Sequence, residues 1–154
     1  MPPQERIVVA SNRKARHDYT IGDVYEAGVV LQGTEVKSLR EGKANIKDAY
    51  ATIDGNELWL VNGRIEPYSM GNIHNHSAAR PRKLLLKRKE LKKLIGLLKT
   101  KGVTIVPLQL YFNEKGMAKM EIGVATGKKQ HEKREAIKDR DWKRDQARIM
   151  KERG

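Results

Sequence analysis

The stretch AYATIDGNELWLV, residues 49–61, contains the clearest fold signal in the chain. Its two halves, 49–53 and 57–61, are rich in apolar, β-branched and aromatic residues, and Asp54-Gly55-Asn56 separates them. Asp-Gly between two such runs favours a tight β-hairpin, because glycine readily adopts the positive φ that hairpin turns require. The stretch therefore predicts two antiparallel strands.

More strands are predicted on both sides of this hairpin. Gly28 lies within a β-rich run, where it is expected to mark a bulge or a close approach of another backbone. Pro107 lies within another run and favours an edge position or a bulge, because proline cannot donate a ladder hydrogen bond. The additional strands or extended segments are expected at residues 7–10, 24–31, 83–86, 103–112 and 117–125.

One short and one long helix are predicted. The short helix is expected from Glu35 to Glu41, with Thr34 as N-cap and Gly42 closing it. The long helix is expected over residues 87–101. It has one apolar stripe, with lysines largely on its other faces; the stripe is formed by Leu91, Leu94, Ile95 and Leu98.

The remaining segments are predicted as loops or termini. Residues 1–6 are interpreted as a flexible leader, 11–18 as a turn-like segment and 69–82 as an aperiodic loop. About six short strands with turn signals predict a mainly β domain built on a small closed sheet, of the oligonucleotide-binding type. Its default core residues are Ile7, Val9, Val24, Val36, Leu39, Leu58, Leu60, Val106 and Leu110.

Positive charge is concentrated in two parts of the chain. The 154 residues carry 32 Lys and Arg against 19 Asp and Glu, a net charge of +13. Residues 80–101 contain ten basic and one acidic residue, and residues 127–154 contain 11 basic and six acidic residues. Two basic zones on a chain of this size indicate a polyanionic partner, most commonly nucleic acid. A merely solvated lysine surface remains the alternative.

Several function classes are not supported by the sequence. There is no run of about 18 apolar residues, which excludes a membrane-spanning helix. The chain has no cysteine and no apolar signal-peptide region after its first methionine, which favours a cytoplasmic location. His17, His74, His76 and His131 lack companions at zinc-ligand spacing, and no catalytic set of residues is visible. We therefore expect no enzyme activity, no metal and no cofactor.

The C-terminal segment differs in composition from the rest. Only six of its 28 residues, 127–154, are apolar, so it is expected to be a basic tail that is disordered when free. The domain is accordingly expected to comprise residues 1–126. Trp142 has nothing local to bury it, and three roles remain open: packing onto the barrel, stacking on RNA or filling a partner's groove.

The chain resembles a known bacterial family in several blocks. They are ASNRKARHDY, YEAGVVLQGTEVKSLREGKANIKDAY, RKLLLKRKEL, IGVATGKKQHEKREAIKDRDW and ARIMK. In order and spacing these blocks resemble the small protein B (SsrA-binding protein) family, from about Ile7 to Arg153. The resemblance implies a six-stranded oligonucleotide-binding-type barrel that binds the tRNA-like domain of transfer-messenger RNA. It also implies delivery of that RNA to stalled ribosomes for trans-translation, without catalysis.

Particular residues follow from this resemblance. Glu26 and Leu85 match family positions tied to RNA binding, through hydrogen bonds to base or ribose edges and packing on an exposed base, respectively. A third such position often holds asparagine but is Lys87 here, so a phosphate contact is expected in place of an amide contact. The electrostatic and polar candidates are Arg13, Lys14, Arg16, Lys37, Arg40, Lys43, Asn45, Arg82 and Lys83.

The tail is expected to act on the ribosome. The resemblance implies that one group of tail residues meets the decoding region: Gly127, Lys128, Lys129, His131, Lys133 and Arg134. It implies that the part with Trp142, Ile149 and Met150 becomes helical along the empty messenger channel. The expected partners are transfer-messenger RNA and the ribosome, with one copy of the protein on the RNA and no membrane. The alternatives are a ribosomal or ribosome-assembly RNA-binding protein and an RNA-processing enzyme.

Overall fold

The computed structural model describes residues 6–70 and 75–127. The strands in these ranges are β1 (Ile7–Ser11), β2 (Thr20–Val29), β3 (Ala44–Asn45), β4 (Tyr50–Asp54), β5 (Glu57–Val61), β6 (Arg64–Ile65), β7 (Arg82–Leu85), β8 (Val103–Phe112) and β9 (Ala118–Thr126). The helices are α1 (Arg13–Asp18), α2 (Gly33–Arg40) and α3 (Arg88–Leu98). None of the helices in these ranges is long and apolar enough to cross a membrane.

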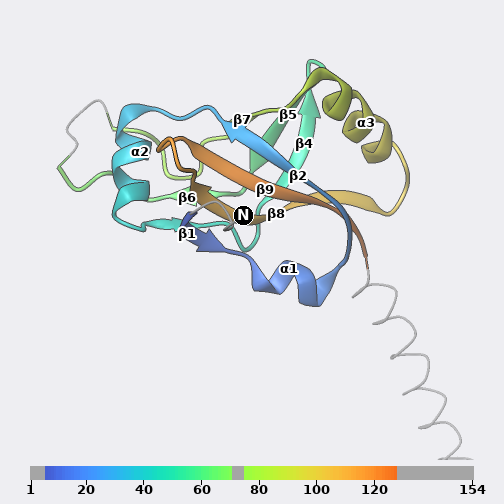
Figure 1. Ribbon diagram of the computed structural model, residues 1–154, viewed down its shortest axis with the longest axis horizontal. Helices are drawn as coiled ribbons and strands as arrows, with labels where there is room; N and C mark the ends of the chain where they lie inside the picture. Colours follow the sequence, from blue (N-terminus) through green and yellow to red (C-terminus); the bar gives the residue numbers. More distant parts are fainter. Residues whose placement is uncertain (1–5, 71–74, 128–154) are drawn as a thin grey trace, which may run out of the picture.

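Six antiparallel strands close into a barrel (Figure 1). Their order is β8-β4-β5-β7-β2-β9, and β9 pairs in turn with β8. β1 lies outside this ring and pairs with the end of β8, from Ser11 opposite Gln109 to Ile7 opposite Phe112. β3 and β6 form a separate two-stranded sheet. The predicted small closed barrel of six strands is thus confirmed.

The hairpin at residues 49–61 forms as predicted. β4 and β5 pair from Tyr50 opposite Val61 to Asp54 opposite Glu57. The two turn residues, Gly55 and Asn56, have φ values of 58° and 61°. Positive φ at both central residues is what a two-residue hairpin turn of the favoured hand requires. Pro107 likewise lies at an irregularity, between Pro107 and Gln109 in the β8–β9 pairing.

The segment predicted as a turn at residues 11–18 is instead the helix α1. Asn12 caps it, because its Oδ1 accepts a hydrogen bond from the Ala15 amide at 3.2 Å. The Asn12 side-chain amide also donates to the carbonyls of Ile46, at 3.2 Å, and Pro107, at 2.9 Å. These two contacts anchor α1 to the barrel, which explains why such a short polar segment is helical. The chain therefore has three helices in its described part, one more than predicted.

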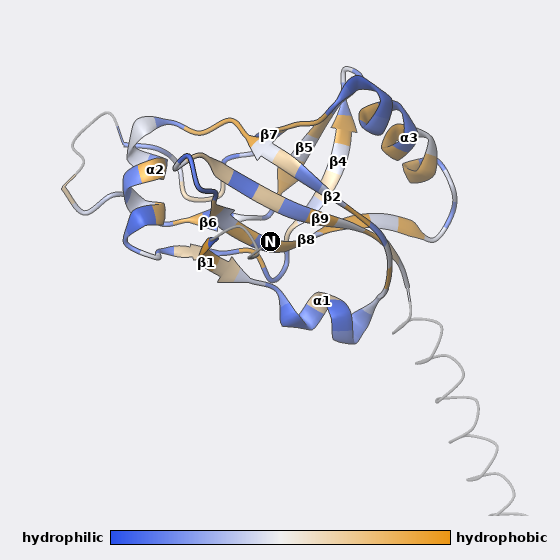
Figure 2. Ribbon diagram, in the orientation of Figure 1, coloured by the Kyte–Doolittle hydropathy of each residue, from blue (hydrophilic) through white to orange (hydrophobic). Residues whose placement is uncertain are grey.

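The two predicted helices form with altered ends. α2 begins at Gly33 with Gln32 as its N-cap, so the predicted N-cap Thr34 was wrong; the Gln32 amide donates to Glu35 Oε1 at 2.8 Å. α3 ends at Leu98 rather than Lys101. Leu94 is fully buried, and Leu91, Leu97 and Leu98 pack against the core. Leu97, which the predicted stripe omitted, thus also belongs to the apolar side of α3. Figure 2 shows apolar and hydrophilic parts of this helix.

Most predicted core residues are buried or pack against buried residues. Leu39, Leu58, Leu60, Val106 and Leu110 are buried, and Val9 and Val36 pack against the core. Two residues do not belong to it: Ile7 is 69% exposed and Val24 is 44% exposed. β1 pairs on one side only, which leaves Ile7 at the end of the sheet. An irregularity in the β2–β9 pairing between Ile21 and Val24 breaks the regular alternation there.

Candidate functional site

The candidate site lies on the outer face of β2. Ala27 is fully buried, and its neighbours Tyr25 and Val29 pack against the core. Because side chains alternate along a strand, Glu26 and Gly28 face outward between them. The pairing of β2 with β7 places Leu85 opposite Gly28. Glu26 and Leu85, which are 59 positions apart in the sequence, therefore belong to one surface.

Leu85 and Gly28 form a small apolar patch on this surface. The Leu85 side chain is 50% exposed, which is unusual for a leucine in a barrel strand. A Cβ atom added to Gly28 would lie 3.3 Å from the Cβ atom of Leu85. Glycine therefore leaves room beside Leu85. The predicted bulge or close backbone approach at Gly28 is here a close approach of the Leu85 side chain on the paired strand. An exposed leucine with free space next to it can pack against a flat apolar group.

Tyr111 holds the Glu26 carboxylate in place. The Tyr111 hydroxyl donates a hydrogen bond to Glu26 Oε2, although the two residues are 85 positions apart. Tyr111 is 1% exposed, and the Arg6 guanidinium lies 4.2 Å from the centre of its ring. Burial and the hydrogen bond to Glu26 both raise the pKa of Tyr111, so its hydroxyl remains a donor at neutral pH. The second carboxylate oxygen of Glu26 makes no hydrogen bond within residues 6–70 and 75–127 and can accept one from a ligand.

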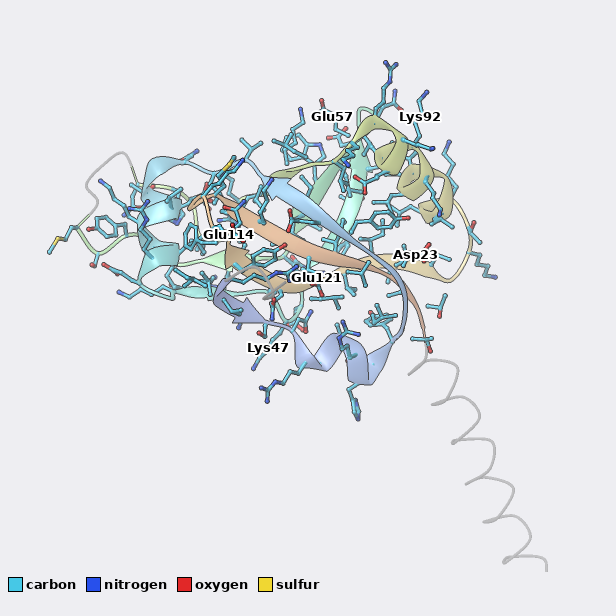
Figure 3. All side chains as sticks on the ribbon, in the orientation of Figure 1. Asp23, Lys47, Glu57, Lys92, Glu114 and Glu121 are labelled. Carbon is cyan, nitrogen blue, oxygen red and sulfur yellow. The ribbon has the colours of Figure 1, made fainter. Side chains whose placement is uncertain are left out.

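Glu121 extends the polar part of this surface. It pairs opposite Glu26 across β2 and β9, and Figure 3 shows it beside β9. Its carboxylate binds Arg6 Nη1 at 2.9 Å and Arg16 Nη2 at 3.8 Å. Arg6, which is predicted to belong to a flexible leader, thus contacts the barrel. Tyr111, Arg6 and Glu121 are not among the residues predicted for the site. For Glu121, the alternation along 119–122, in which Met120 and Ile122 are buried, is a signal that places its side chain on the outer face.

Apart from those on β7 and at the start of α3, the predicted basic and polar residues occupy two separate groups. Arg13, Lys14 and Arg16 are exposed on α1, where Lys14 is 3.4 Å from Asp48. The other group lies on α2 and the segment after it, and α1 and α2 are on different sides of the barrel in Figure 1. This second group consists of Lys37, Arg40, Lys43 and Asn45, all exposed. Lys37 lies 5.6 Å from the Tyr68 ring, and Lys43 is 3.2 Å from Glu41.

Lys83 and Lys87 lie next to Leu85. Lys83 is half-buried, and its ammonium group is 2.8 Å from Glu57 Oε1. Lys87 is exposed and is the N-cap residue of α3. Of these two lysines, Lys87 is therefore the one better placed for a ligand phosphate.

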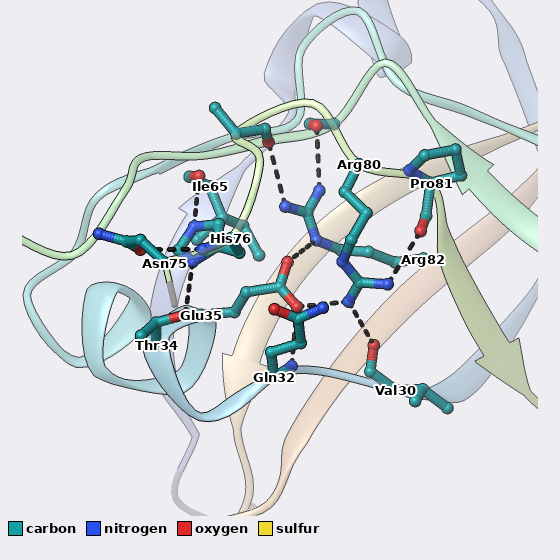
Figure 4. Close-up of polar contacts among 12 residues, drawn as sticks. Val30, Gln32, Thr34, Glu35, Ile65, Asn75, His76, Arg80, Pro81 and Arg82 are labelled. Atoms are coloured by element: carbon teal, nitrogen blue, oxygen red, sulfur yellow. Dashed lines mark hydrogen bonds and ion pairs between the residues drawn. The ribbon is translucent and has the colours of Figure 1, made fainter. Parts of the chain in front are cut away.

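Arg82 is buried and does not form part of the RNA-binding surface for which it is predicted. It is 2% exposed, and its guanidinium binds the Glu35 carboxylate (Figure 4). It also donates to the carbonyls of Gly63, at 3.1 Å, and Ala78, at 3.0 Å. Every nitrogen of this guanidinium is thus used within the fold. Arg82 has a structural role, because a charge count along the sequence does not distinguish a buried arginine from an exposed one.

Glu35 is the centre of a buried ionic cluster. Its side chain is fully buried and binds both Arg80 and Arg82 (Figure 4). Burial alone would raise the pKa of Glu35, but hydrogen bonds from Arg80, the Gln32 amide and Arg82 outweigh it and hold the pKa below its ordinary value. The cluster joins α2 to the start of β7. It therefore fixes the strand that carries Leu85.

His76 is part of the same structural region. It is 6% exposed; its Nε2 is 2.9 Å from the Ile65 carbonyl and its Nδ1 is 2.8 Å from the Thr34 hydroxyl. These contacts tie the segment that begins at Asn75 to α2 and β6. His74 lies outside the described residues. Within them, no cluster of three or more His, Asp or Glu side chains could hold a metal ion.

The last described residue, Gly127, lies beside an open groove of about 570 Å³. The groove is lined by residues of α1, of the segment 47–50 and of the beginning of β8, and its polar lining includes Lys14, Asp18 and Lys47. Gly127 was one of the predicted tail residues. The others, Lys128, Lys129, His131, Lys133, Arg134, Trp142, Ile149 and Met150, lie outside the described residues.

Comparisons with known proteins agree on one family. The sequence model of the family described as SmpB protein matches residues 9–152. The chain is 56% identical over 146 residues to the SsrA-binding protein of Chelativorans sp. (strain BNC1), covering 95% of this chain and 94% of the relative. It is 57% identical over 146 residues to the SsrA-binding protein of Sphingomonas elodea, covering 95% and 91%.

A solved structure is also similar. It is described as "tmRNA-SmpB: a journey to the center of the bacterial ribosome". The matched chain is 51% identical, with a TM-score of 0.65, covering 77% of this chain and 82% of that chain. Both the sequence and the barrel are therefore similar to proteins of one kind.

Proposed function

Because the chain belongs to the SmpB protein family, we propose that it binds the tRNA-like domain of transfer-messenger RNA and delivers that RNA to stalled ribosomes. Delivery leads to trans-translation, in which the nascent peptide is tagged and the ribosome is released. The role is one of binding rather than catalysis, and it takes place in the cytoplasm. One protein molecule acts on each RNA.

The outer face of β2 and β7 is the proposed contact with the tRNA-like domain. The observation that carries this assignment is the register that places Leu85 opposite Gly28, two residues from Glu26. Leu85 offers an apolar surface to an unpaired base, and the free oxygen of Glu26 accepts a hydrogen bond from a base or ribose edge. Recognition of this kind suits looped RNA, whose bases are not all paired.

Phosphate contacts come from the exposed basic residues around this face. Arg16 is the member of the α1 group that reaches the face, because it approaches Glu121. Lys87 lies two residues after Leu85. Such contacts supply affinity that falls as salt rises, whereas the contacts of Glu26 and Leu85 supply selectivity. The wider set of phosphate-binding candidates is Arg13, Lys14, Arg16, Lys37, Arg40, Lys43, Lys83 and Lys87, with Asn45 as a polar neighbour.

Residues 127–154 are the proposed ribosome-binding part. Their net charge of +5 suits ribosomal RNA. Gly127 to Arg134 would meet the decoding region, and the part with Trp142, Ile149 and Met150 would enter the messenger channel. The barrel and the tail thus divide the work between two RNA partners.

Sequencing of RNA that copurifies with the protein tests the proposed function. We expect transfer-messenger RNA to be enriched far above its share of cellular RNA. A ribosomal or ribosome-assembly protein would instead recover ribosomal RNA without transfer-messenger RNA. That result would contradict the proposal.

Leu85→Ala is expected to weaken binding to the tRNA-like domain about tenfold, because packing of one base on a side chain contributes roughly 1–3 kcal/mol. The stability of the protein should change little, since half of the Leu85 side chain is already exposed. Binding is measured by titration of a labelled transcript, and stability by thermal unfolding. Met117→Ala is the matched control, because Met117 is 55% exposed but lies in the turn before β9. Equal affinities of the two variants would exclude a base contact at Leu85.

A further inference from the structure

The helix α3 carries basic residues that the candidate site does not use. The segment 80–101 contributes ten positive charges and one negative charge, but the site described above involves only its first residues. The remaining basic side chains lie on α3 and just after it, and all are exposed. They are Arg88, Lys89, Lys92, Lys93, Lys99 and Lys101.

All of these side chains except Lys101 form two rows along the solvent-facing side of α3. Leu94 is fully buried, so the opposite side of the helix faces solvent (Figure 2). With 3.6 residues per turn, Arg88, Lys92 and Lys99 follow one another along one row. Lys89 and Lys93 follow a second row. Lys92 points away from the barrel in Figure 3.

Few of these charges are neutralised by the protein. Lys93 approaches Asp23 at 3.5 Å, and both side chains are well exposed. In the part of the chain that the structure describes, the other basic residues of α3 take part in no ion pair. Repulsion among like charges on one helix is unfavourable unless a polyanion relieves it.

Gly96 leaves a gap between the two rows. It is exposed on the solvent-facing side, and nothing lies within 4 Å of the position its Cβ atom would occupy. Neither a positive φ nor a close neighbour requires glycine at this position. Glycine in the middle of a helix lowers the stability of that helix. No contact within the described part of the protein accounts for glycine at this position. A ligand that approaches the helix backbone closely would account for it.

We propose that the solvent-facing side of α3 is a second RNA-binding surface, where a phosphate backbone lies over Gly96 between the two basic rows. This inference rests on the proposed function, because it takes RNA as the ligand. It adds a surface that begins where the barrel face ends, since Leu85 closes β7 and Arg88 opens α3. Phosphate is the shared chemistry of transfer-messenger RNA and ribosomal RNA, and the experiment distinguishes them.

The test compares two double variants of equal net charge in the full-length protein. Lys92→Gln with Lys99→Gln removes two charges from one row of α3. Lys47→Gln with Lys115→Gln removes two exposed charges elsewhere. The probes are a transcript of the tRNA-like domain and purified small ribosomal subunits. The α3 variant is expected to bind at least one probe about tenfold more weakly than the control, with a salt slope smaller by about 1.5.

Each outcome is decisive. The probe that loses affinity identifies which RNA contacts α3. Equal binding of the α3 and control variants to both probes would overturn the inference while leaving the proposed function intact. Failure of the unchanged protein to bind the tRNA-like domain would instead overturn the proposed function.

Gly96→Gln tests whether the space between the two basic rows is needed for RNA binding, because the substitution leaves the net charge unchanged. Glutamine favours helix, so the variant should unfold at a higher temperature than the unchanged protein. Its side chain would fill the space between the rows, and binding to the probe identified above should weaken severalfold. Higher stability with unchanged affinity would show that the RNA does not lie over Gly96.

Discussion

Glu35→Gln is expected to lower the free energy of unfolding by about 3–5 kcal/mol, because it removes one partner of a buried ionic cluster. Arg82, which is 2% exposed, would keep its charge without a carboxylate, and Arg80 would lose the same partner. The glutamine side chain has nearly the same shape, so the loss would report charge rather than packing. Chemical denaturation followed by circular dichroism measures the change.

The cluster also predicts how stability depends on pH. The pKa of Glu35 is lower in the folded protein than its ordinary value of 4.5. Its contribution is therefore present in full above pH 4.5 and is lost as pH falls through the lower, folded pKa. In that acidic window, the stability of Glu35→Gln should fall less steeply with pH than that of the unchanged protein.

Glu41→Gln is the control for this prediction. Glu41 follows the same helix and pairs with Lys43 at 3.2 Å, but both side chains are well exposed. An exposed pair of this kind contributes at most about 1 kcal/mol. A loss of similar size in the two variants would contradict the structural role given to Glu35.

Truncation after Thr126 is expected to abolish tagging on stalled ribosomes while leaving binding to the tRNA-like domain within about threefold. The buried core residues lie between Ala15 and Ala125, so the barrel keeps its packing. The removed segment carries a net charge of +5, which would contribute non-specific affinity for RNA at low salt. Binding should therefore be measured near physiological salt, beside tagging of a stalled nascent peptide in a reconstituted system.

A chain with a permuted tail shows whether tagging depends on the order of the tail residues or only on their net charge. A chain in which residues 128–154 are reordered keeps the same net charge and length. We expect it to bind the tRNA-like domain and to fail in tagging. Tagging by either the truncated or the permuted chain would contradict the division of work between barrel and tail.

Local signals in the sequence predicted most of the barrel. The hairpin at 49–61 and the strand at 103–112 depend on neighbouring residues, and both formed as expected. The helix α1 could not be predicted in this way, because its anchors are the carbonyls of Ile46 and Pro107, 34 and 95 positions away from Asn12. The two-residue strands β3 and β6 are too short to produce any period.

Less of the candidate site than of the fold could be predicted from the sequence. Glu26 and Leu85 were selected from a family resemblance, and only the β2–β7 register places them on one surface. Tyr111 reaches Glu26 from a different strand, and no sequence pattern indicates that contact. The basic neighbours of Arg82 predict an exposed side chain, whereas Glu35 binds Arg82 in the interior, far from it in the sequence.

The double pairing of β9 has a consequence for how the protein folds. β9 is the last strand of the barrel in the chain and pairs with both β2 and β8. Its contacts with β2 join residues about a hundred positions apart, such as Thr20 and Thr126. Such long-range pairings slow folding, because the entropy of closing a large loop is lost before the contacts form. Until β9 is synthesised, β2 and β8 would each expose an unpaired edge, which favours aggregation of the incomplete chain.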